Sequence, residues 1–180
     1  TRVSTCPLPP SIRRAHAFPS GPRKMTTAAT LMVKTVIAMT GAKSPGGIAA
    51  SNLVGEPGLL ALLRFPGEMA RLRADTSLAP AAVEELLRYD GPNGAQVRIV
   101  REEHERHGKR LMPGDRVFIL LNAANRDPRA YADPDRLDLQ RAGPPHLAFG
   151  FGLHICLGFP LARLEGQIAL PAVLARWPGL

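Results

Sequence analysis

The sequence of 180 residues is long enough for one ordinary domain, and its hydrophobic content of 45% is sufficient for a core. It contains no apolar run of about 18 residues, so it predicts no membrane-spanning helix. The two cysteines lie far apart and outside any CxxC pattern, which indicates neither a disulfide framework nor a zinc site. We therefore expect a soluble, cytoplasmic protein.

The net charge of +8 is concentrated in the first 55 residues, which carry seven basic residues and no acidic residue. A basic segment of this kind is compatible with nucleic-acid binding. Its single aromatic residue, Phe18, offers little surface for base stacking. We keep a basic nucleic-acid-binding module as the weakest alternative and expect no nucleic-acid partner. Residues 1–50 contain six prolines and no clear period, which predicts an irregular segment.

From Asn52 onward, apolar residues recur at helical spacing. Four leucines over 59–63 predict a short helix that Pro66 ends, and residues 67–74 predict a second helix. A third helix is predicted over 81–89, because its apolar residues form one stripe and a proline suits the first helical turn.

The following stretch predicts short antiparallel strands. Residues 96–100 alternate between polar and apolar side chains, and residues 116–121 are rich in β-forming residues. A Pro-Gly pair at 113–114 predicts the turn between the two strands. His104 and His107 lie in the charged part of this hairpin, where we expect them to be solvated.

The remainder of the chain predicts a helical turn, a long loop and a final helix. The helical turn is predicted over residues 122–127. The Asp-, Pro- and Arg-rich stretch 127–145 has little period and predicts either an ordered loop or a linker. The last helix is predicted from Cys156 to Arg176, with an interruption at Pro171.

A glycine-rich segment, FGFGLHICLG at residues 149–158, precedes this last helix. Gly150, Gly152 and Gly158 would permit positive φ angles and a close approach of the backbone to a flat ligand. Cys156 would lie at the helix start, where free N–H groups stabilise a thiolate. The segment therefore predicts a reactive or metal-binding cysteine.

Four interpretations of this segment compete. A dinucleotide-binding loop would require glycine at the position of Ile155. A nucleophilic cysteine would require an orienting Asn or Asp, and none is evident beside His154. A small buried structural cysteine is the usual fate of a lone Cys. The complete ten-residue pattern favours the fourth interpretation, in which Cys156 is a thiolate ligand to haem iron.

That pattern resembles the signature of the cytochrome P450 family, FxxGxxxCxG, which is met at Phe149, Gly152, Cys156 and Gly158. Residues 85–88, Glu-Leu-Leu-Arg, resemble the ExxR helix of the family, and residues 125–136 resemble the stretch before its haem loop. The resemblance covers residues 51–180. It implies a partial cytochrome P450 fold, the C-terminal haem-side part, which is mainly α with small antiparallel β-sheets.

The resemblance also implies roles for single residues around a haem b cofactor. Cys156 would be the axial thiolate, and hence both the metal ligand and the catalytic residue. Phe149 would pack beside the haem and shield the sulfur, although plain core packing is equally compatible with a phenylalanine there. The other residues expected to bind the cofactor are Arg98, Gly150, Gly152, His154 and Gly158.

Two of these residues would hold the haem propionates, namely Arg98 and His154, because cationic or hydrogen-bonding side chains pair with carboxylates. An exposed strand arginine without that role would look the same as Arg98. Glu85, Arg88 and Arg136 resemble a structural ion-pair triad of the family, which holds the haem loop and takes no part in the chemistry.

The family implies a haem-thiolate monooxygenase that oxidises a small organic substrate with O2. Electrons would come from NAD(P)H through a ferredoxin and a ferredoxin reductase, without a membrane. Because family members are more than twice this length, we expect a C-terminal fragment in which residues 1–50 are not native family sequence. Ile48 and Ala49 occupy the positions of the family's acid and threonine, so we expect this chain alone to be inactive. The alternative is a non-catalytic remnant that binds haem weakly or not at all.

Overall fold

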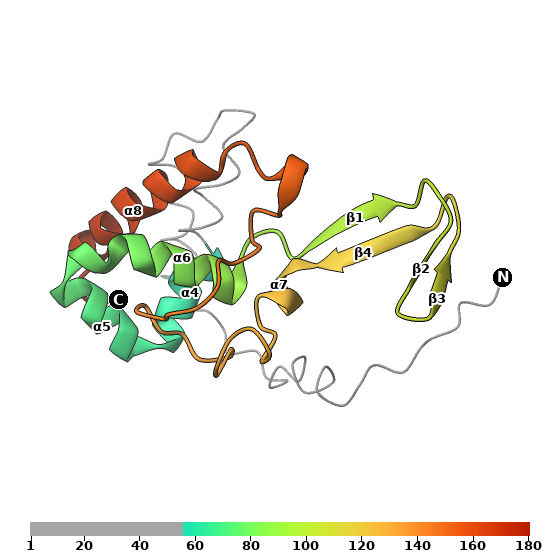
Figure 1. Cartoon of the computed structure of the whole chain (residues 1–180). Helices are drawn as coiled ribbons and strands as arrows, with labels where there is room; N and C mark the ends of the chain where they lie inside the picture. Colours follow the sequence, from blue (N-terminus) through green and yellow to red (C-terminus); the bar gives the residue numbers. More distant parts are fainter. Residues whose placement is uncertain (1–55) are drawn as a thin grey trace. The chain divides into compact units, whose positions relative to one another are not determined.

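The computed structural model describes residues 56–180, which are coloured by sequence position in Figure 1. The basic segment 1–50, together with Ile48 and Ala49, lies outside the described residues. The described part is mainly α-helical with two small antiparallel sheets, as the sequence predicts. Within it, no helix is both long enough and apolar enough to cross a membrane.

The first three predicted helices are confirmed, each with bounds close to the expected ones. They are α4 (Glu56–Arg64), α5 (Pro66–Ala74) and α6 (Ala79–Asp90), with a short 3-10 turn, η1 (Thr76–Leu78), before α6. Pro66 and Pro80 both lie in first helical turns, where the missing N–H of proline would have no partner in the helix. Pro66 therefore ends one helix and begins the next.

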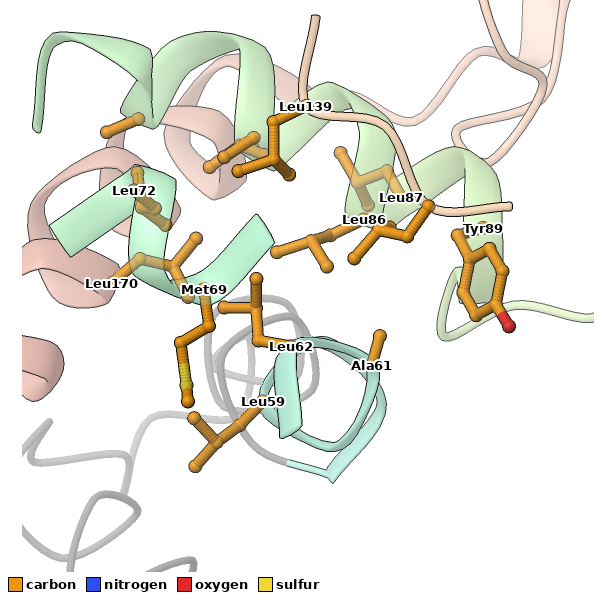
Figure 2. Packing of buried hydrophobic residues seen from close by; sticks show 14 of the residues in the cluster. Leu59, Ala61, Leu62, Met69, Leu72, Leu86, Leu87, Tyr89, Leu139 and Leu170 are labelled. Carbon is orange, nitrogen blue, oxygen red and sulfur yellow. The ribbon is translucent and has the colours of Figure 1, made fainter. Parts of the chain in front are cut away.

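The core is formed by leucines that α6 brings together with its neighbouring helices. Helix α6 packs against α4 and against α8 (Phe159–Arg176). Leu62, Leu86 and Leu170 are fully buried in this cluster, and Figure 2 shows them with the surrounding side chains. Burial of a leucine side chain stabilises a fold by about 1.5–3 kcal/mol, so these residues fix the position of α6 beneath the loops that follow it.

The two predicted strands are also confirmed, but their connection differs from the prediction. Strand β1 (Ala95–Ile99) pairs with β4 (Arg116–Leu120) in antiparallel register, with Val97 opposite Phe118. A second hairpin of β2 (His104–Arg106) and β3 (Lys109–Leu111) is inserted between them, so the turn at 113–114 does not join β1 to β4 directly.

The long stretch after β4 is an ordered loop and not a linker. After the short helix α7 (Leu121–Ala124), the chain runs without regular structure to the 3-10 turn η2 (Gly152–His154). Leu137 and Leu139 are buried in the core cluster, and the side-chain oxygen of Asn125 accepts a hydrogen bond of 2.7 Å from the N–H of Leu147. These contacts hold the loop against α6.

Helix α8 differs from the prediction at two points. It begins at Phe159 instead of Cys156, because the N–H of Cys156 donates to the carbonyl of Phe149 and keeps the cysteine in a turn before the helix. Pro171 lies inside the helix without ending it. The buried side chains of Leu170 and Val173 on either side of the proline hold both parts of α8 to the core, which offsets the lost backbone hydrogen bond.

Candidate functional site

Cys156 lies in a closed loop between η2 and α8, with its thiol exposed. The N–H of Cys156 donates to the carbonyl of Phe149 over 2.9 Å, and the N–H of Gly150 donates to the carbonyl of Leu147 over 2.8 Å. The N–H of Phe159 donates in turn to the carbonyl of Cys156. These backbone hydrogen bonds fold residues 149–156 into a loop that presents the sulfur.

Two glycines allow this loop to turn, and a third does not contribute in the expected way. Gly150 and Gly152 have φ angles of 77° and 76°, which side-chain-bearing residues rarely adopt. A Cβ on Gly150 would also lie 3.1 Å from Nε2 of Gln96. Gly158 has a φ of −84°, so the predicted positive φ is wrong there.

Among the described residues, the loop itself carries apolar side chains that lie exposed. Leu153 and Leu157 are almost completely exposed on either side of Cys156, and Phe151 is 87% exposed. Exposed apolar groups in such number mark a surface that contacts another apolar body.

The two residues expected to hold propionates are both at the surface. Arg98 is exposed on β1, and its guanidinium donates to the carbonyl of Val97 and to Oε1 of Gln96, each over 3.0 Å. Since Gln96 lies against Gly150, Arg98 is linked to the cysteine loop through one side chain. His154 is exposed within η2. Both side chains are therefore accessible to an anionic group.

Phe149 is partly buried and packs against the core cluster. Its ring lies 5.7 Å from the ring of His146 and 6.1 Å from that of Phe159, between centroids. The guanidinium of Arg163 lies 5.1 Å from the centre of the same ring. Phe149 thus joins the start of the cysteine loop to the first turn of α8.

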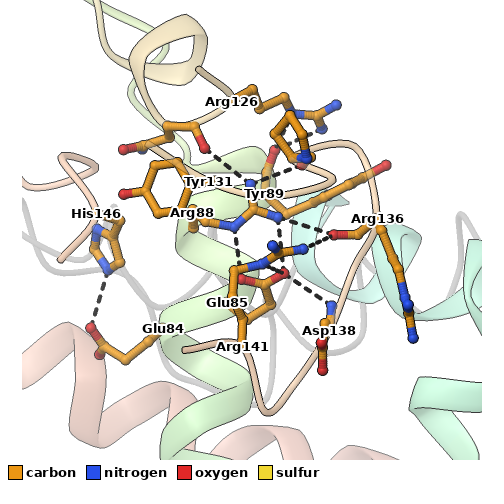
Figure 3. Close-up of polar contacts among 12 residues, drawn as sticks. Glu84, Glu85, Arg88, Tyr89, Arg126, Tyr131, Arg136, Asp138, Arg141 and His146 are labelled. Atoms are coloured by element: carbon orange, nitrogen blue, oxygen red, sulfur yellow. Dashed lines mark hydrogen bonds and ion pairs between the residues drawn. The ribbon is translucent and has the colours of Figure 1, made fainter. Parts of the chain in front are cut away.

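Glu85 and Arg88 form a buried ion pair on α6, which Figure 3 shows in its surroundings. The guanidinium donates to both carboxylate oxygens, over 2.7 and 2.9 Å, and the two side chains are only 4% and 3% exposed. Arg88 also donates to the carbonyls of Asn125 and Pro134. The pair therefore connects α6 to the long loop before the cysteine.

Arg136 does not complete this ion pair with its side chain, contrary to the prediction. Its side chain is exposed, and only its carbonyl takes part, accepting from Arg88 over 3.2 Å. The second cation on Glu85 is Arg141, whose Nε lies 3.0 Å from Oε1 and whose side chain is 11% exposed. Arg136 and Arg141 lie in the same Arg-rich loop, so no spacing in the sequence distinguishes them.

A second polar cluster, which sequence reasoning missed, centres on Glu84. The guanidinium of Arg163 donates to both of its carboxylate oxygens, over 2.6 and 2.8 Å. His146 Nε2 lies 3.2 Å from Oε2. Burial would raise the pKa of Glu84, but the contacts with His146 and Arg163 outweigh it and lower this pKa to about 2. Glu84 directly precedes the glutamate of the ExxR pattern, and no motif in the sequence indicates a role for it.

The donor set and its surroundings fit a flat apolar cofactor held by one sulfur. Cys156 supplies a single soft ligand atom, which suits haem iron. The nearby exposed apolar side chains suit the faces of a porphyrin, and Arg98 and His154 suit its carboxylates. Within residues 56–180, no cluster of three or more His, Cys, Asp or Glu side chains offers a site for a bare metal ion.

Comparisons with known proteins agree with this geometry. The chain is 44% identical over 122 residues to a biotin biosynthesis cytochrome P450 of Bacillus subtilis, covering 68% of this chain and 31% of that protein. It is 50% identical over 121 residues to the nocardicin C N-oxygenase of Nocardia uniformis, covering 66% and 30%.

A solved structure, Mycobacterium smegmatis CYP164A2 with econazole bound, is similar with a TM-score of 0.70 and 45% identity. The match covers 74% of this chain and 33% of that one, so the chain spans about a third of the length of its relatives. The sequence model of the family described as "Cytochrome P450" matches residues 69–178. This chain belongs to the cytochrome P450 family.

Proposed function

We propose that this chain is the haem-binding part of a haem-thiolate monooxygenase in which Cys156 is the axial ligand. The observation that carries the proposal is the exposed thiol of Cys156 in a loop closed by backbone hydrogen bonds and bordered by exposed apolar side chains. Family membership supports haem binding and oxidation chemistry.

Residues of the loop and of β1 would each make a different contribution to binding haem b. Gly150 and Gly152 give the backbone its turn, and Phe149 covers the side of the loop towards the core. Arg98 and His154 would pair with the propionates. When bound, haem supplies iron at which O2 is activated, so that one oxygen atom enters an organic substrate.

The family and the names of the relatives support the partners that we propose. Relatives are named for biotin biosynthesis and for N-oxygenation of nocardicin C, which supports a small organic substrate for the whole protein. We propose that electrons come from NAD(P)H through a ferredoxin and its reductase in the cytoplasm. The sequence has only two cysteines, far apart and outside any CxxC pattern, which supports a reducing compartment.

The activity is proposed for a whole protein, because the chain spans about a third of its relatives. For this chain alone we propose haem binding without hydroxylation. Ile48 and Ala49 occupy the positions where the family has an acid and a threonine, and neither side chain can deliver a proton to activated oxygen.

Reconstitution with haem tests the proposal. The purified chain is titrated with haem, reduced and exposed to CO, and its absorption is recorded. We expect the Soret band of a thiolate-ligated CO complex. Absence of this band at saturating haem would overturn the proposal. A turnover assay with NADPH, ferredoxin, reductase and small apolar substrates tests the second part, and product coupled to NADPH consumption above a free-haem control would contradict it.

A further inference from the structure

The cluster around Glu84 joins three segments that the ExxR pair does not join. Glu84 lies on α6, His146 lies three residues before Phe149, and Arg163 lies in the first turns of α8, after Cys156. One carboxylate therefore contacts both ends of the loop that carries the cysteine. Figure 3 shows Glu84 facing His146 across the gap between α6 and the loop.

The orientation of His146 is set by the loop itself. Its Nδ1 accepts a hydrogen bond of 3.1 Å from the N–H of Ala148, so the ring proton belongs on Nε2. This nitrogen is buried and has no well-aligned acceptor, and the nearest charge is Oε2 of Glu84 at 3.2 Å. The contact is therefore electrostatic, and Glu84 is the group that compensates the buried N–H.

Arg163 extends the cluster to the aromatic side chains that flank Cys156. Its guanidinium lies 5.1 Å from the ring centre of Phe149 and 5.0 Å from that of Phe159. Arginine in these positions is attracted to the face of each ring. Because Glu84 fixes the guanidinium with two hydrogen bonds, it also fixes the cation on which the two rings lie.

We infer that Glu84 is a positioning residue for the thiolate loop, acting through Arg163 and His146 to hold the two flanks of Cys156 at a fixed separation. The inference deepens the proposed function and rests on it only for the role of the cysteine. The ExxR pair holds the preceding loop to α6, whereas Glu84 holds the cysteine loop itself.

Amide hydrogen exchange in the haem-free chain tests this inference at single residues. In Glu84→Gln the cation of Arg163 loses its charged partner, and we expect the amides of Gly150 and Cys156 to exchange roughly fivefold faster. The matched control is Glu103→Gln, which removes the exposed ion pair with Arg110 from a carboxylate of similar exposure, 44% against 41%. It should leave both amides unchanged.

Haem binding then supplies an independent readout. With Glu84→Gln we expect a smaller fraction of thiolate-type CO absorption at equal haem, and we expect no loss with Glu103→Gln. If Glu84→Gln does not fold, Arg163→Lys replaces it, since lysine keeps the charge but loses the two parallel hydrogen bonds. Unchanged exchange at both amides in a folded variant would overturn the inference. If the unaltered chain lacks the thiolate band, the proposed function fails, while the exchange data still decide the role of Glu84.

Discussion

At the residue scale, Glu85 is a buried carboxylate whose two oxygens are fully hydrogen-bonded. It accepts two hydrogen bonds from Arg88, one from Arg141 and one from the N–H of Asp138. A buried carboxylate is tolerated only with such compensation. Its value lies in holding the loop before Cys156 to α6, since each of its partners other than Arg88 belongs to that loop.

We expect Glu85→Gln to lower the free energy of unfolding by about 3–5 kcal/mol, because Arg88 would be left buried without its carboxylate. Urea denaturation followed by circular dichroism measures the change. Glu103→Gln, at an exposed ion pair, should cost less than about 1 kcal/mol. Equal costs for the two variants would show that the buried pair contributes nothing beyond a surface pair.

Glu84 gives the protein an acid-sensitive contact. Its pKa is about 2 in the folded chain against an ordinary value of 4.5. A carboxyl with a lowered folded pKa contributes stability above its unfolded pKa and loses it as the pH falls through the folded value. We therefore compare the unfolding free energies of the unaltered chain and Glu84→Gln. We expect their difference to be largest above pH 4.5 and to decrease as the pH falls towards 2.

The measurement is a series of urea denaturations across this range. Asp127, whose pKa is also lowered to about 2 through its hydrogen bonds with Arg129, titrates in both proteins and cancels in the difference. A difference that stays constant from pH 4.5 down to pH 2 would contradict the assigned ion pair.

At the element scale, α6 acts as the platform to which the loops attach. Its buried face packs on α4 and α8, and its polar residues face the loop of residues 125–149. The exit of the helix is equally constrained, because a Cβ on Gly91 would lie 2.8 Å from the carbonyl of Leu87 and 3.1 Å from Cβ of Ala148. A side chain larger than that of glycine is therefore poorly tolerated at position 91, where the chain leaves α6.

Two arginines in the attached loop should differ sharply in their effect on stability. Arg141→Met removes a hydrogen bond to the buried carboxylate of Glu85, and we expect a loss of about 1–3 kcal/mol in unfolding free energy. Arg136→Met leaves the participating carbonyl in place and should change stability by less than about 0.5 kcal/mol. The reverse order in urea denaturation would restore Arg136 as the third member of the ion-pair cluster.

Two glycine substitutions test the exit of α6 in the same way. Gly91→Ala should destabilise the chain by about 1–3 kcal/mol, because the added methyl group meets backbone and side-chain atoms that cannot easily move. Gly67→Ala, inside α5 with open space around it, should stabilise by about 0.5–1 kcal/mol. Thermal unfolding of both variants measures the contrast, and a stabilising Gly91→Ala would refute the close packing of the α6 exit.

At the scale of the whole molecule, local patterns predicted the main helices and the strands β1 and β4, but not the hairpin of β2 and β3 or the contacts between distant segments. The helices around Leu62, Met69 and Leu86 follow from apolar stripes that are visible in the sequence. The true start of α8 depends on a hydrogen bond from Cys156 to Phe149, which no local propensity contains.

The candidate site shows the same division. Its glycine-rich loop is contiguous and could be predicted, as could the pairing of Glu85 with Arg88. The second cation on Glu85 could not be predicted, because Arg136 and Arg141 lie in the same Arg-rich loop. Glu84, His146 and Arg163 come from three separated segments, and only packing brings them together. Residues that act through contacts between distant segments could therefore be identified only from the structure.

The identity of the ligand to haem iron is tested most directly by replacing Cys156. The unaltered chain and Cys156→Ala are reconstituted with haem, reduced, exposed to CO and compared by absorption. Glu103→Gln, prepared in the same way, shows whether a substitution away from the cysteine changes the spectrum. We expect a thiolate-type Soret band in the unaltered chain and the control, and its complete loss in Cys156→Ala. An unchanged band in Cys156→Ala would contradict the assignment of Cys156 as the axial ligand.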